Sequence, residues 1–249
     1  MTDDTRKKSD PPLSMDAIAE DLFGLNIRGL FSILTLWRHP RQYFDAARTA
    51  EWSNRFTPSI RLWLSFFALF SALKLWWIGQ NESMIGAFAD GFANAGLTLP
   101  DDTTYEDVGR EAVMFSFGLV PILQIITMLL LSVIYTAWGE RTTLALRQRQ
   151  LFAVMIPSAS VMPVFLTLML FVPQDALTAY GIVLALVALV IDFQTGYRGA
   201  FFSVSNLGRF WRAALLAVII VILNTATAII AQIMGIVLTS QKYGVMPTS

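Results

Sequence analysis

The chain has 249 residues, of which 55% are hydrophobic and 14% are charged, and its formal net charge is zero. Soluble domains carry about 25% charged residues, so this composition excludes an ordinary soluble globular fold and indicates a protein that resides in lipid. The chain contains no cysteine, which excludes disulfides, thiolate metal sites, thiol nucleophiles and S-acylation.

Residues 1–21 form a polar segment that contains Pro11 and Pro12. The segment lacks the apolar core of a signal peptide, so we expect no cleavage. Its composition predicts a disordered cytoplasmic tail.

Residues 22–57 are predicted to form an amphipathic arm that precedes the first membrane span. Between Phe23 and Trp37 the apolar residues follow one stripe of a helix that is too short to cross a bilayer, and Pro40 ends it. Further along, aromatic residues are interleaved with arginines, a pattern typical of a helix in the headgroup layer of an anionic membrane. The alternative is that the arm packs under the bundle as a cytoplasmic lid. The residues assigned to the membrane surface are Trp37, Arg38, Arg41, Tyr43, Arg48, Trp52 and Arg55.

Five apolar stretches are each long enough to cross the hydrocarbon core, which requires about 20 residues of helix. We therefore predict an all-α integral membrane protein, with a five-helix transmembrane bundle at residues 58–240 and a short outer tail at 241–249. The expected spans are 59–79, 113–138, 151–172, 176–195 and 213–238.

Basic residues are concentrated on one side of the expected spans, and the positive-inside rule places the cytoplasm on that side. The arm and the loops after the second and fourth spans are rich in arginine. The remaining loops and the C-terminal tail contain just Arg110 and Lys242. This asymmetry predicts a cytoplasmic N-terminus and a C-terminus on the outer side.

The segment LWRHPRQYF at residues 36–44 and the segment RFTP at residues 55–58 lead directly into the first span. Over about residues 22–75, this arrangement resembles an uncharacterised family of bacterial multi-span proteins. The resemblance implies an inner-membrane location and no assigned activity. Many such proteins begin with a cysteine-rich metal ribbon, and a role that depends on the ribbon does not extend to a chain without cysteine. The five-span layout is also similar to that of Yip-type membrane proteins.

The loop between the first two spans, residues 80–112, is acidic. Within it, Thr103 and Glu106 have the spacing of a capping box, so we expect them to begin the helix of the second span. The alternative, a divalent-cation site built from the acidic residues, matches no known calcium-loop spacing.

Several expected spans contain polar or helix-breaking residues. Pro157 and Pro163 in the third span release backbone carbonyls, which indicates either a kink satisfied by neighbouring serines or a broken helix that binds a ligand. Asn224 belongs to a small, polar stripe of the fifth span, and Gln124 belongs to a polar stripe of the second. We expect the two stripes to meet inside the bundle, either as packing contacts or as the wall of a polar cavity.

Asp192 is the one acid clearly within an expected span, near the cytoplasmic end of the fourth. An ionisable group in lipid is costly unless it is paired or hydrated. We therefore expect an ion pair between Asp192 and Arg198, or another arginine of the cytoplasmic loops, that fastens the fourth span to the basic face. A proton relay through Asp192 is the alternative.

The sequence contains no motif of a common enzyme class. His39 is the single histidine, which excludes paired-histidine metal sites, and there is no phosphate-binding loop. We predict no enzyme activity, no cofactor and no metal. The first functional hypothesis is a non-enzymatic scaffold or accessory subunit of a membrane assembly. The second is a small transporter or lipid-handling protein.

The expected partners are membrane lipids, together with a membrane protein or a second copy of the chain. Nucleic acid is not expected, because Asp45 and Glu51 dilute a basic patch that adjoins the membrane.

Overall fold

The computed structural model describes residues 27–49, 55–78, 82–134, 143–199 and 205–244. Over these ranges the chain is helical and contains no strand. The predicted tail at 1–21 and the arm residue Trp52 lie outside the described residues. The helices are α2 (Ile27–Arg38), α3 (Pro40–Ala47), α5 (Ser59–Ile78), α6 (Glu82–Asn94), α7 (Tyr105–Ile134), α8 (Leu144–Met169), the short 3₁₀ helix η2 (Gln174–Ala176), α9 (Leu177–Gly199) and α10 (Asn206–Lys242).

Four segments within the described residues are long and apolar enough to cross a membrane. Large apolar side chains on these helices are exposed, for example Ile182 and Leu186 on α9 and Ile126 on α7. Lipid chains accommodate such a surface, whereas water does not, so the predicted all-α membrane class is confirmed. The segments are Tyr105–Ser132, Leu144–Met169, Gln174–Gly199 and Asn206–Lys242.

The helices extend beyond the apolar spans that the sequence delimits. α7, α8 and α10 begin at Tyr105, Leu144 and Asn206, each about two turns before the expected span. These first turns are polar, so hydropathy alone does not find them. α5 contains a shorter apolar stretch, Ser59–Leu73, which is not among the four segments above.

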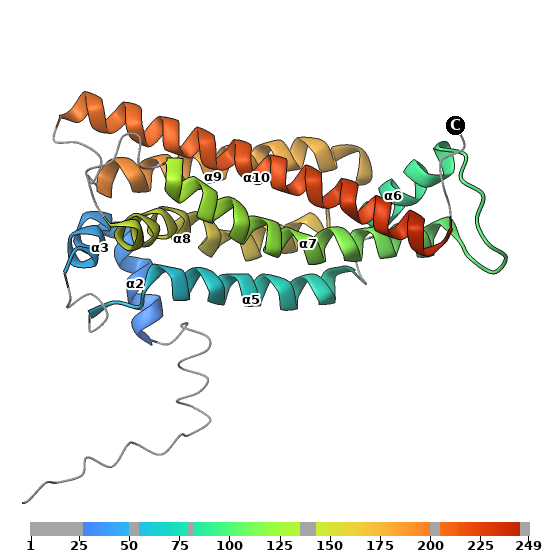
Figure 1. Ribbon diagram of the computed structural model, residues 1–249, viewed down its shortest axis with the longest axis horizontal. Helices are drawn as coiled ribbons and strands as arrows, with labels where there is room; N and C mark the ends of the chain where they lie inside the picture. Colours follow the sequence, from blue (N-terminus) through green and yellow to red (C-terminus); the bar gives the residue numbers. More distant parts are fainter. Residues whose placement is uncertain (1–26, 50–54, 79–81, 135–142, 200–204, 245–249) are drawn as a thin grey trace, which may run out of the picture.

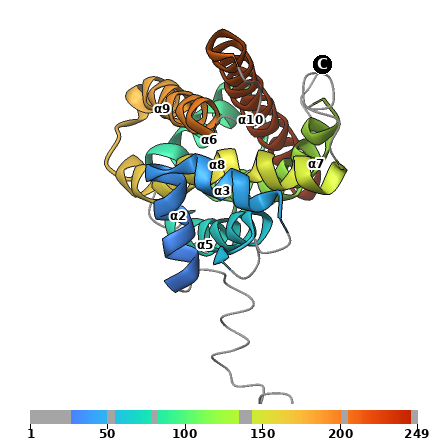
Figure 2. The same cartoon turned by 90° about the vertical axis from the view of Figure 1, so that its left-hand side faces the viewer.

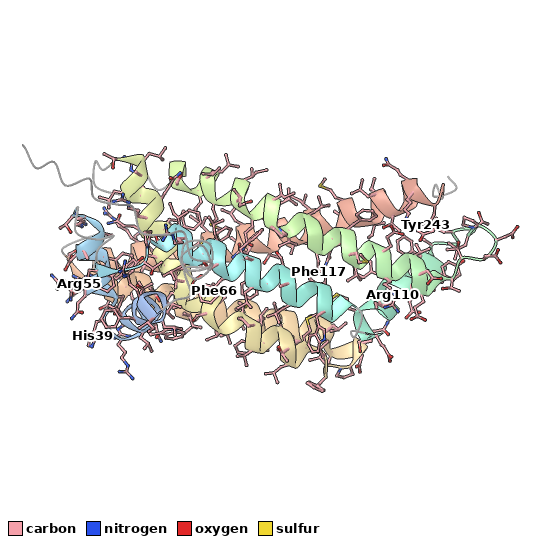
Figure 3. The ribbon with its side chains drawn as sticks, turned by 90° about the horizontal axis from the view of Figure 1, so that it is seen from below. His39, Arg55, Phe66, Arg110, Phe117 and Tyr243 are labelled. Carbon is pink, nitrogen blue, oxygen red and sulfur yellow. The ribbon has the colours of Figure 1, made fainter. Side chains whose placement is uncertain are left out.

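The long helices are connected in a closed series of contacts. α10 packs against α7 and α9, α9 against α8, α8 against α5, and α5 against α7. Figure 3 shows His39 and Arg55 at one end of the molecule and Arg110 and Tyr243 at the other. We call the first the arm end, because α2 and α3 form it, and the second the α6 end.

α8 changes direction along its length. Figures 1 and 2 show its first part crossing the arm end and its later part running along the bundle. Every residue from Gln150 to Ser158 is buried, as expected for a helix enclosed on all sides. Pro157 lies within this stretch. Because proline has no N–H for the carbonyl one turn earlier, it permits the bend.

The arm end has its own core. Tyr43 and Phe44 of α3 are fully buried, as is Phe56. The Tyr43 hydroxyl donates to the Thr57 carbonyl at 2.7 Å, and the Thr57 N–H donates to the Ser32 hydroxyl at 2.9 Å. These bonds connect α3 and α2 to the segment that begins α5. The arm is therefore part of the folded unit.

At the α6 end, the helix start differs from the prediction by one residue. Thr104, not Thr103, caps α7. The Thr104 hydroxyl accepts from the Asp107 N–H at 3.2 Å, and the Asp107 carboxylate accepts from the Thr104 N–H at 3.1 Å. This reciprocal pair is a capping box. Because α7 begins at Tyr105, the acid three residues after the cap is Asp107, and Glu106 instead pairs with Arg110.

Candidate intramembrane binding cavity

A cavity of about 640 Å³ lies among α5, α8, α9 and α10, with Gln124 contributed by α7. Volumes of this size are typical of small-molecule sites. Its lining residues at the arm end, Trp63, Ser158 and Asp192, are buried, whereas those toward the α6 end, such as Thr178, are exposed. The cavity is thus closed at the arm end and opens over the other half of the bundle.

One wall of the cavity is aromatic. It comes from a single face of α5, at the spacing i, i+3, i+4, i+7, and it consists of Trp63, Phe66, Phe67 and Phe70. Figure 3 shows Phe66 in the middle part of the bundle, between the two ends. These four residues were not among the predicted site residues, although their helical spacing is visible in the sequence. In an apolar span, such a face is indistinguishable from one that packs against another helix.

Asp192 lies at the closed end of the cavity and is 2% exposed. Its Oδ1 is buried without a hydrogen-bond partner among the described residues. The hydroxyl of Ser158 lies within hydrogen-bonding reach of the Asp192 carboxyl and also of the Met155 carbonyl, 3.0 Å away. A hydroxyl has a single proton, so it serves one of these acceptors at a time. The carboxyl is therefore under-satisfied.

The predicted ion pair between Asp192 and Arg198 is not formed. Arg198 donates instead to the backbone carbonyls of Trp37, at 3.0 Å, and Arg38. These carbonyls end α2, and a guanidinium there satisfies acceptors that the helix leaves free. Since α2 occupies the arginine, the role of Asp192 as a fastener of α9 is not supported.

The serines near the prolines of α8 satisfy local carbonyls. Ser160 donates to the Pro157 carbonyl at 2.7 Å, and Thr167 donates to the Pro163 carbonyl at 2.8 Å. The carbonyls that Pro157 and Pro163 leave without an N–H are those of Ala153 and Ala159, one turn earlier, so these hydroxyl bonds go to other carbonyls of the helix. α8 runs unbroken from Leu144 to Met169, and Ser158, beside Pro157, lines the cavity. Ligand binding at the proline bend stays a prediction.

The polar stripes of α7 and α10 meet, as predicted. Gln124 donates to Asn224 at 3.4 Å, and the hydroxyls of Thr127 and Thr227 are 3.1 Å apart. Gln124 and Asn224 also line the cavity, whereas the threonine pair does not. The stripes are therefore packing contacts along most of their length and a cavity wall at the amide pair.

The predicted membrane-surface residues of the arm occupy different environments. Tyr43 belongs to the arm-end core instead of the surface. Trp37 is half-buried, and its Nε1 donates to the Ser160 hydroxyl at 3.0 Å, which connects α2 to α8. The arm thus packs as a lid and still presents basic residues outward. The exposed arginines are Arg38, Arg41, Arg48 and Arg55.

The site defines a class of protein, an integral membrane helical bundle with a cavity that is closed at one end and open at the other. Within the described residues, no group of three or more histidine, cysteine or acidic side chains is placed to hold a metal. No protein-family model, curated protein or solved structure matches this chain. The resemblance of residues 22–75 to a bacterial membrane family therefore stays a prediction.

Proposed function

We propose that the chain is a non-enzymatic membrane protein that binds a lipophilic, membrane-dissolved molecule in this cavity, as a small transporter or a lipid-handling protein does. The observation that carries the proposal is the under-satisfied Asp192 at the closed end of a large, mostly apolar cavity. A protein that acts as a scaffold alone gains nothing from burying such a group, because burial without partners is destabilising. The scaffold or accessory-subunit hypothesis stays a prediction.

The aromatic wall supports the same proposal. Trp63 packs against Phe67 and Phe152 with ring centroids 5.7 and 5.2 Å away, so its ring is held in place instead of filling the cavity. Small residues on the facing side of α9, Ala185 and Ala188, leave the volume open. Apolar walls with a few placed polar groups are the usual composition of ligand pockets.

Filling the cavity is expected to remove the bound molecule. Ala188→Phe places a ring in the cavity, whereas Val190→Phe, on the same helix, places one on the exposed face. We expect a lipophilic molecule to co-purify with the wild type and with Val190→Phe, and its amount to fall about tenfold or more in Ala188→Phe. The measurement is mass spectrometry of small molecules extracted from equal amounts of folded protein. Equal contents in all three proteins would exclude the cavity as the binding site.

For the membrane arrangement we propose five crossings, with α5 as the first, a cytoplasmic arm end and a bacterial inner-membrane location. The charge distribution at the arm end supports this orientation. Besides the arm, the arginines at the start of α8, the end of α9 and the start of α10 lie at the arm end, and the α6 end carries few basic residues. Those arginines are Arg147, Arg149, Arg198, Arg209 and Arg212.

α2 is proposed to lie at the cytoplasmic interface, held by its small, polar face. Gly29, Ser32 and Thr35 are buried against the rest of the protein. The opposite stripe, which includes Ile27 at 88% exposure and Leu34 at 53%, is left for lipid. This geometry suits a helix that lies in the membrane plane.

Labelling of single cysteines tests the five-crossing arrangement directly, because the natural chain has none. Gln42 on α3 and Ala95 after α6 are both exposed. We expect a membrane-impermeant maleimide to label Ala95→Cys in intact cells, and to label Gln42→Cys only after the inner membrane is permeabilised. Opposite sides for the two sites require α5 to cross. Labelling of both from the same side would reduce the crossings to four.

A further inference from the structure

We propose that the cavity selects a lipophilic organic cation, with an ammonium-type group against Asp192 and an apolar body along α9. The inference rests on the proposed binding function and specifies its ligand class. Of the described residues that line the cavity, Asp192 is the one ionisable side chain. Its other polar lining groups are uncharged: Gln124, Ser158, Thr178, Asn224, Thr225 and Gln232.

The carboxyl of Asp192 has the properties of a counter-ion site. It is 2% exposed, its Oδ1 has no partner, and its contact with Ser158 is shared with a backbone carbonyl. The nearest arginine along the chain, Arg198, is engaged by the end of α2. A positive charge brought by a ligand would satisfy this carboxyl, and in a cavity of low dielectric that attraction is strong.

A metal ion does not fit this site. Calcium and magnesium take six or more oxygen ligands, and the described residues contain no cluster of acidic or histidine ligands around Asp192. The surrounding wall is instead made of rings and thioethers: Trp63 and Phe66 from α5, and Met155 from α8. Aromatic faces attract organic cations, and a thioether adapts to the shape of an apolar body.

An amine-bearing phospholipid does not fit either. Beside the carboxyl of Asp192 its phosphate would need a basic group to balance its charge, and the described lining contains no lysine, arginine or histidine. The ligand is therefore a cation without an attached anion. The lining positions on α9 run from Thr178 to Asp192. At a rise of about 1.5 Å per residue, this stretch is about 21 Å long, enough for an extended apolar body.

The experiment compares two fluorescent probes that differ in charge. Neutral diphenylhexatriene and its trimethylammonium derivative are titrated into zwitterionic nanodiscs that contain the full chain, with empty nanodiscs subtracted. Binding is followed by energy transfer from Trp63 to the probe. Because the chain has seven tryptophans, the transfer measured with the Trp63→Phe form of each protein is subtracted, which leaves the contribution of Trp63. The variants are Asp192→Asn and, as the matched control, Asp175→Asn in the exposed η2 turn.

For the wild type and for Asp175→Asn, we expect the affinity of the cationic probe to exceed that of the neutral probe by about tenfold or more. In Asp192→Asn this preference should vanish. Binding of the neutral probe by Asp192→Asn shows that the variant is folded. Its thermal midpoint should not fall, because the carboxylate loses no basic partner. Equal binding of both probes to the wild type would overturn the charge selectivity and leave the binding function intact. Absence of Trp63-dependent energy transfer to both probes would overturn the charge selectivity and the binding function together.

Discussion

Replacing Gly235 with valine is expected to lower the free energy of unfolding by about 3 kcal/mol, the upper end of the usual range for overpacking. A Cβ atom at Gly235 would lie 2.8 Å from the Ala112 carbonyl oxygen and 2.8 Å from the Ser116 nitrogen of α7, and it would overlap the Ser116 hydroxyl. Two of these atoms belong to the backbone, so α10 must move away from α7 to make room. That movement would also separate Thr127 from Thr227.

Gly118→Val is the matched control for this substitution. Gly118 lies on α7, and a Cβ there meets no atom within 4 Å. Both variants introduce a β-branched residue into a long apolar helix, so the shared effect on helix propensity cancels in the comparison. The measurement is the midpoint of unfolding in one detergent, followed by circular dichroism. Equal midpoints for the two variants would mean that α7 and α10 do not approach at Gly235.

The contact at Gly235 also shows what the sequence predicts well. The spacing of Asn224, Thr227 and Gly235 defines one face of a helix whatever its neighbour is, and apolar length alone predicts the four long, membrane-compatible helices of the described residues. Such periodic signals are local, and the structure retains them. The sequence also identified Gln124 as a member of the facing stripe, and the two amides are in contact.

Features that depend on the exact residue at which a helix starts, or on a partner far away in the sequence, were less predictable. Thr103 and Thr104 each precede an acid by three residues, so the pattern alone does not choose the cap. The partners of Arg198 lie about 160 positions earlier in the chain, at the end of α2. Nothing local to Asp192 distinguishes an arginine that pairs with it from one that caps another helix.

The aromatic residues of the arm were ambiguous for a related reason. A face with tyrosine and phenylalanine between arginines has the same pattern whether it meets lipid or protein. In α3 that face meets protein, because Tyr43 and Phe44 are buried, whereas in α2 the apolar stripe stays exposed. The α3 part of the arm is therefore packed into the arm end of the bundle, while α2 keeps an exposed apolar stripe.

Replacing Tyr43 with alanine is expected to lower the free energy of unfolding by about 3–5 kcal/mol, as truncation of a buried aromatic side chain does. Tyr43 is fully buried, and its ring packs against Phe44 and Phe56 with centroids 6.4 and 5.1 Å away. Its hydroxyl also satisfies the Thr57 carbonyl at 2.7 Å. The loss combines a cavity in the arm-end core with an unsatisfied acceptor.

Two further variants separate the contributions at Tyr43. Tyr43→Phe keeps the ring and removes the hydroxyl, so a loss of about 1 kcal/mol is expected. Gln42→Ala changes the exposed neighbour on α3 and is expected to have little effect. The order of unfolding midpoints should be Gln42→Ala, Tyr43→Phe and Tyr43→Ala, from highest to lowest. If Tyr43→Ala is as stable as Gln42→Ala, the arm is not packed on the bundle.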